Sequence, residues 1–456
     1  MNESDTNANR PTIGKVSSTV PIDESPSRLR SPRELLRDSF YWLIPTLLSI
    51  PLIFRGITAR PLSHDEFYTL HAINKGLDQH YWELPLVPYY WLMQQWTIQG
   101  TYTSDFVLRF PSGIAALASV ALVAVTAKRV HSRRAGLFAG LLLAFSPVTP
   151  VFAHDARPYA IGAVLFSLSS LLLVRALQGG SIGNWLIYGV VILAGAAVLP
   201  VGLVAVSGQA LLVLYLRKSN KAFGFWLAAL AVSIPAVLFH ALLLPGFSER
   251  KAWAAQPGLL DIITGFTWTG SAGTAGGLMT GGSGLLIITL GLLSRDGRYW
   301  LGAATVGILA LWVVSLGPTS FWSGKSAITL VALATVGAGI SLAGFSRLTS
   351  GLIVVVAAAL ALEAFTATRQ PRTIEPDLRQ ATAIISQNVD KSSVVIDRGS
   401  EYGIATAVRQ YSDRDDLVFD DTPNGPFWTV YQEPDCTVIE RWDLGGDAYL
   451  KLCEPL

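Results

Sequence analysis

The chain has 456 residues, of which 51% are hydrophobic and only 14% charged, and its mean hydropathy is +0.43. An ordinary soluble domain carries about 25% charged residues, so this composition excludes a soluble multidomain protein and indicates a polytopic membrane protein. The net charge of +2 is too small to indicate a nucleic-acid partner. Both cysteines, Cys436 and Cys453, stand near the C-terminus, which excludes a cysteine zinc site in the main body.

Residues 1–37 are polar and rich in Ser, Pro and Arg, which predicts a disordered tail. Four arginines come shortly before the first apolar run: Arg28, Arg30, Arg33 and Arg37. Positive charge beside a span is typical of its cytoplasmic side, so we expect this tail in the cytoplasm.

Residues 38–366 alternate long apolar runs with short polar breaks, which predicts a transmembrane domain. We expect about eleven spanning helices, near residues 40–57, 107–126, 136–152, 158–176, 184–199, 201–216, 222–244, 282–294, 299–316, 327–345 and 350–366. With residue 1 inside, every predicted inner loop carries Lys or Arg. Of the ten acidic residues between 40 and 366, only Asp296 falls inside. This asymmetry is typical of a multi-pass protein of the plasma membrane.

An odd number of spans places residues 367–456 outside the cell. This segment is charged and combines a helix-like run, Asp377–Asn388, with a β-branched run, Ser393–Asp397, which predicts a small α/β domain. An oxidising compartment favours a disulfide between Cys436 and Cys453. The expected fold is therefore an all-α polytopic membrane protein with a small C-terminal extracytoplasmic α/β domain.

The first outer loop, about residues 58–106, is too long for a simple connector. It carries two adjacent acids, Asp65 and Glu66, just beyond the first span, where a carboxylate is costly unless it is used. These acids are equally compatible with a solvated helix N-cap and with a functional site.

The second outer loop is short but gathers His154, Asp155, Arg157 and Tyr159 at one membrane edge. A role as an interfacial anchor would explain Arg157 and Tyr159 but not His154 and Asp155. Together the two loops could hold a divalent cation, bind a phosphate through Arg157 and leave one carboxylate as a general base.

The stretch 61–165 resembles the GT-C glycosyltransferases, in particular bacterial proteins similar to protein O-mannosyltransferases (glycosyltransferase family 39). The resemblance covers about a quarter of the chain. Its matching pieces, in order, are Asp65–Leu70, Leu84–Tyr90 with Trp96, Leu108–Ser112, Arg133–Leu137, Phe145–Pro147 and Asp155–Ala160.

The resemblance implies transfer of a sugar, mannose or another hexose or pentose, from a polyprenyl-phosphate donor to a hydroxyl of a glycan, lipid or protein, with inversion. It implies Asp65 as the general base, with Glu66 and Asp155 beside it as catalytic residues that would either share Mg²⁺ or Mn²⁺ or position the acceptor. Arg157 would hold the donor phosphate. His64, His154 and Tyr159 would support the site, with the histidines hydrogen-bonded to carboxylates rather than ligating metal.

One departure from the family pattern concerns a late outer loop, where many relatives carry an Arg-Tyr pair. Here the corresponding place reads Gly324-Lys325-Ser326, so Lys325 would neutralise phosphate as a point charge without a planar fork.

Two other classes of function remain as alternatives. A secondary transporter would need ionisable residues at mid-bilayer within broken or repeated helices, and the predicted spans are nearly free of charge. An envelope-assembly protein would act through the C-terminal domain without catalysis.

Overall fold

The structure is a computed structural model of the whole chain. It describes residues 32–75, 84–179, 181–216, 220–250, 256–263, 273–317, 320–322, 325–367, 378–388, 394–396, 404–412, 417–420, 427–429, 436–444 and 449–455. Most of the predicted tail, the aromatic segment around Tyr81, and the start of the C-terminal segment up to Asp377 lie outside these residues.

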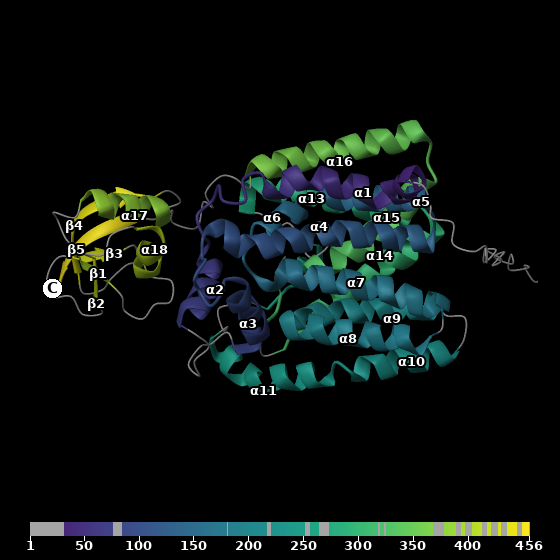
Figure 1. Cartoon of the computed structure of the whole chain (residues 1–456), viewed down its shortest axis with the longest axis horizontal. Coiled ribbons are helices and arrows are strands. Elements are labelled where there is room, and N and C mark those ends of the chain that lie inside the picture. Colours follow the sequence, from purple (N-terminus) through teal and green to yellow (C-terminus); the bar gives the residue numbers. More distant parts are fainter. Residues whose placement is uncertain are drawn as a thin grey trace, which may run out of the picture. The chain divides into compact units, whose positions relative to one another are not determined.

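The transmembrane part is made of α-helices that run side by side (Figure 1). The described helices are α1 Pro32–Phe54, α2 His64–Lys75, α3 Val87–Trp96, α4 Asp105–Val130, α5 Arg133–Ala144, α6 Val148–Ala153, α7 Pro158–Gly179, α8 Ile182–Val198, α9 Val204–Leu216, α10 Asn220–Ala231, α11 Ile234–Arg250, α13 Gly273–Leu292, α14 Arg295–Ser315, α15 Ile328–Ala343 and α16 Arg347–Ala367. Short 3₁₀ turns, η1 Leu84–Leu86 and η2 Pro200–Leu203, precede α3 and α9. Each predicted span falls on one helix or on two consecutive ones.

Three of the described helices are long and apolar enough to cross a membrane: α4, α7 and α14. Residues 220–231 and 234–242, bent by 40°, would together make a fourth. Six shorter apolar helices of 10–17 residues accompany them. The multi-span character is thus observed, whereas the number of eleven spans stays a prediction.

Serine residues explain where several of these helices begin. Ser104, Ser132, Ser181 and Ser294 have extended backbones, and each hydroxyl accepts a hydrogen bond from the backbone N–H three residues later. Such capping satisfies one of the N–H groups that a helix start leaves without an internal partner. Pro158 begins α7, at a position where its missing N–H costs nothing.

The C-terminal part combines two helices, α17 Leu378–Gln387 and α18 Ile404–Tyr411, with a five-stranded sheet of order β2-β1-β3-β5-β4. The strands are β1 Val394–Ile396, β2 Val418–Asp420, β3 Phe427–Thr429, β4 Cys436–Asp443 and β5 Tyr449–Pro455. β1 pairs in parallel with β2 and β3, whereas β5 is antiparallel to β3 and β4. This segment therefore contains both helices and strands, as predicted, whereas its standing as a separate extracytoplasmic domain stays a prediction.

The predicted disulfide is also formed. Cys453 in β5 is disulfide-bonded, and the sequence contains one other cysteine, Cys436. In the sheet Cys453 faces Val438, two residues along β4 from Cys436.

Candidate active site

The two predicted acidic loops meet at one end of the helices. Asp65 and Glu66 lie in the first turn of α2, and the second loop connects α6 to α7. Three hydrogen bonds join them: Ala156 N–H to Glu66 (2.9 Å), the Thr69 hydroxyl to the Ala156 carbonyl (2.8 Å), and Arg157 to the Asp65 carbonyl (3.0 Å). Residues about ninety positions apart in the sequence therefore share one site.

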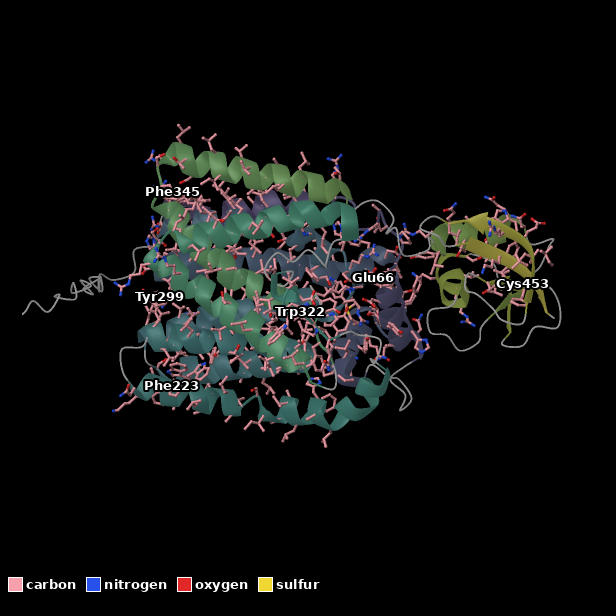
Figure 2. All side chains as sticks on the ribbon, turned by 180° about the vertical axis from the view of Figure 1, so that it is seen from behind. Glu66, Phe223, Tyr299, Trp322, Phe345 and Cys453 are labelled. Atoms are coloured by element: carbon pink, nitrogen blue, oxygen red, sulfur yellow. The ribbon has the colours of Figure 1, made fainter. Side chains whose placement is uncertain are left out.

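Glu66 is the buried centre of this junction and is only 1% exposed. Its carboxylate accepts two hydrogen bonds of 2.7 Å from the guanidinium of Arg109 in α4, one from Ser63 N–H (2.8 Å) and one from Ala156 N–H. Figure 2 shows Glu66 within a dense group of side chains. Burial would raise the pKa of Glu66, but Arg109 and the backbone donors lower it to about 2.

Arg109 belongs to a matching sequence piece but was not among the predicted site residues. Besides Glu66, it donates to the carbonyls of Ile57 (2.8 Å), Arg60 (3.0 Å) and Pro61 (2.9 Å). Its guanidinium therefore holds the chain that leads from α1 into α2. The sequence did contain a signal for this residue. A charged side chain inside an apolar helix costs free energy unless it has a buried partner.

Asp65, Asp155 and Lys325 form a second cluster of charges. The Lys325 ammonium donates a hydrogen bond to Asp65 Oδ2 and lies 4.0 Å from Asp155 Oδ2. Asp155 is 3% exposed, whereas the side chains of Asp65 and Lys325 are 35% and 24% exposed. The open side of this cluster is therefore the Asp65–Lys325 pair, with Asp155 behind it.

Arg157 is buried beside the cluster. One nitrogen, Nη1, donates both to the Asp65 carbonyl and to the Tyr90 hydroxyl (2.9 Å), and the guanidinium lies 6.0 Å from the ring centre of Tyr68. Lys325 in turn lies 5.6 Å from the ring centre of Tyr159. These aromatic rings are favourable neighbours for the two cations.

His154 has a different partner from the one expected. Its Nε2 donates to the backbone carbonyl of Ile53 in α1, not to a carboxylate. Burial lowers the pKa of His154 to about 4 despite this hydrogen bond, so the ring is neutral at pH 7. His64 begins α2, but its side chain lies outside what the structure describes.

The described side chains do not fit the predicted Mg²⁺ or Mn²⁺ site. Nowhere in the described part of the chain do three or more His, Cys, Asp or Glu residues gather in a way that could hold a metal ion. Glu66 already accepts four hydrogen bonds, and the ammonium of Lys325 contacts both Asp65 and Asp155. A divalent cation would have to compete with that ammonium.

The C-terminal part contacts the first outer loop through Asp105, the first residue of α4. Arg379 of α17 forms an ion pair with Asp105, and the Tyr411 hydroxyl of α18 lies 3.4 Å from the same carboxylate. The backbone N–H of Leu62 donates to that hydroxyl (2.9 Å). Burial next to Asp105 raises the pKa of Tyr411.

Comparison with known proteins identifies the class of fold. ArnT from Cupriavidus metallidurans is similar in the apo state (TM-score 0.56) and bound to undecaprenyl phosphate (TM-score 0.55). Each match has 12% identity and covers 91% of this chain and 98% of that one. This likeness shows that the chain has the fold of the GT-C glycosyltransferases.

A family model points to the same class. Residues 84–242 match the model described as dolichyl-phosphate-mannose-protein mannosyltransferase, which confirms the resemblance seen in the motifs. An Archaeoglobus fulgidus oligosaccharyltransferase, solved with a tethered acceptor peptide, matches at 13% identity with a TM-score of 0.48. That match covers 81% of this chain, which spans 59% of the length of the archaeal one. No curated protein matches the chain in sequence.

Proposed function

We propose that this protein is a membrane glycosyltransferase that takes a sugar from a polyprenyl-phosphate donor and passes it to a hydroxyl on the extracytoplasmic face, with inversion. The observation that carries the proposal is the meeting of Asp65, Asp155, Arg157 and Lys325, from three distant segments, at one end of the helices. Two carboxylates beside two cations suit a reaction that removes a proton and releases a phosphate.

Asp65 is the general base in this proposal. It is the most exposed of the three acids and lies in the first turn of α2, where an acceptor can approach it. The acceptor oxygen gives its proton to Asp65 and attacks the anomeric carbon. The bond from that carbon to the phosphate oxygen breaks, and the polyprenyl phosphate leaves with the electron pair.

Arg157 and Lys325 receive the charge that develops on the leaving phosphate. Asp155 keeps the ammonium of Lys325, 4.0 Å away, in the site. Glu66 is a positioning residue because its carboxylate joins both loops to α4. Tyr159 provides an aromatic wall beside Lys325. No step is routed through a divalent cation, because the described side chains do not fit one.

The donor and the acceptor are proposed here by their chemical classes. The ArnT structure with undecaprenyl phosphate and the description of the matching family support a polyprenyl-phosphate donor. We propose mannose or another hexose or pentose as the sugar, and a glycan, lipid or protein as the acceptor. The protein would act in the plasma membrane, with its N-terminus in the cytoplasm.

Sugar transfer by purified protein in nanodiscs, from labelled polyprenyl-phosphate sugars, tests the proposal. Asp65→Asn should lower the transfer rate by about 10²–10⁴-fold, the usual contribution of a general base, without lowering the unfolding temperature. Glu440→Gln, at an exposed position of β4, is the matched control and should leave the rate unchanged. Full activity in both Asp65→Asn and Asp155→Asn would refute the assignment of the site.

A further inference from the structure

The backbone around Lys325 is held, whereas its side chain can move. The Ser326 hydroxyl donates to the Phe321 carbonyl (2.8 Å), and the Ile328 N–H at the start of α15 donates to the Lys325 carbonyl (3.4 Å). The side chain is partly exposed and has four rotatable carbon–carbon bonds. Arg157, by contrast, is buried and its Nη1 is bonded to Asp65 and Tyr90. Of these two cations, Lys325 is the one able to change partners.

In the structure the ammonium of Lys325 donates a hydrogen bond to Asp65, the carboxylate that the proposed reaction uses as its base. A carboxylate that accepts a charge-assisted hydrogen bond from an ammonium is a weaker proton acceptor than one without that partner. Asp65, Asp155, Arg157 and Lys325 also sum to zero formal charge. A donor phosphodiester would add one negative charge, and a cation is needed to meet it.

We propose that Lys325 is a donor-responsive counterion of the catalytic base. Without donor it pairs with Asp65, and when a polyprenyl-phosphate headgroup binds, the ammonium moves to the phosphate and frees Asp65 to take the acceptor proton. Asp155, 4.0 Å from Nζ, keeps the ammonium in the site during this exchange. The enzyme is therefore activated by its donor, and the donor binds before the acceptor hydroxyl is deprotonated. This inference rests on the proposed function.

Carboxylate labelling measures the exchange without any sugar transfer. The probe is a water-soluble carbodiimide with glycine ethyl ester, and peptide mass spectrometry quantifies the amide formed on Asp65. In the same samples the carbodiimide also joins Asp65 directly to Lys325, with loss of one water. Undecaprenyl phosphate should lower this cross-link and raise the labelling of Asp65 by about tenfold, since the lipid shifts the population toward the state in which Lys325 has left Asp65. Undecaprenol, which lacks the phosphate, should change neither yield.

Two variants, Lys325→Met and Lys325→Arg, distinguish movement of Lys325 to the phosphate from simple covering of Asp65 by the bound lipid. Asp65 in the Met variant should be labelled rapidly whether or not undecaprenyl phosphate is present. The Arg variant keeps the charge, so its labelling should still increase with the lipid. A cross-link yield unchanged by undecaprenyl phosphate, or labelling that falls equally in wild type and Lys325→Met, would overturn the inference. Absence of sugar transfer with an intact labelling response would instead count against the proposed function alone.

Discussion

Glu66 and Arg109 form a buried ion pair that joins α2, α4 and the second outer loop. Glu66→Gln should destabilise the protein by about 3–5 kcal/mol, because it leaves a buried guanidinium without its counter-charge. Thermal unfolding in detergent measures the loss, with Glu440→Gln as the exposed control. The double variant Glu66→Gln/Arg109→Met should lose less stability than the sum of the two single variants. Strictly additive losses would contradict a direct coupling between the two side chains.

The lowered pKa of His154 predicts that the stability of the protein depends on pH. Its pKa falls from 6.5 to about 4 on folding, so the folded protein disfavours the charged ring. The free energy of unfolding is therefore unaffected by the titration of His154 above pH 6.5 and decreases as the pH falls from 6.5 toward 4, because the unfolded chain then binds the proton more readily. Unfolding temperatures at pH 7.5 and 5 should therefore differ less in His154→Gln, whose amide can still donate to the Ile53 carbonyl, than in wild type. An equal difference in both proteins would exclude His154 as the cause.

At the scale of elements, small residues allow the helices to approach closely. A Cβ added to Gly208 of α9 would lie 2.1 Å from the Ala303 carbonyl oxygen of α14, which is backbone and cannot turn away. Close helix contact at glycine is typical of membrane proteins.

Gly208→Ala should consequently lower stability by about 1–3 kcal/mol, the usual cost of forcing extra volume into a packed interface. Gly224→Ala in α10 is the matched control, because its added methyl group would meet nothing within 4 Å. The control should be neutral or slightly stabilising, since alanine is the better helix former. Unfolding temperatures measure both variants, and equal values would show that the α9–α14 contact relaxes without cost.

The predicted orientation of the whole molecule rests on the distribution of charge along the chain. Glu440→Cys, in β4, should react with a membrane-impermeant maleimide in right-side-out vesicles, because the positive-inside rule places the C-terminal part outside. Lys128→Cys, near the end of α4, should react only after the vesicles are permeabilised. The native cysteines do not interfere, since Cys453 is disulfide-bonded. Labelling of Lys128→Cys in sealed vesicles would reverse the predicted topology.

Hydropathy and local chemistry allowed much of the fold to be predicted. Apolar runs located the helices because a membrane requires about twenty apolar residues per span. β-branched residues and the two cysteines indicated the sheet and its disulfide. Asp65 was predicted as a site residue because an acid beside an apolar span is costly without a use, and Asp155 because of the charged second loop and the family resemblance; both roles stay predictions. All of these signals lie within a few residues of the feature that they predict.

The roles of the individual acids depend on partners that lie far away in the sequence. Glu66 and Asp65 are neighbours, yet Glu66 accepts two hydrogen bonds from Arg109, 43 positions away, whereas Asp65 is paired with Lys325, 260 positions away. His154 likewise finds its partner on α1. The amino-acid sequence by itself determined which segments are helices and which loops carry charge, because those properties are local. Only the tertiary structure decided that Glu66 is buried and Asp65 partly exposed, because packing brings four donors to Glu66 and leaves Asp65 beside Lys325.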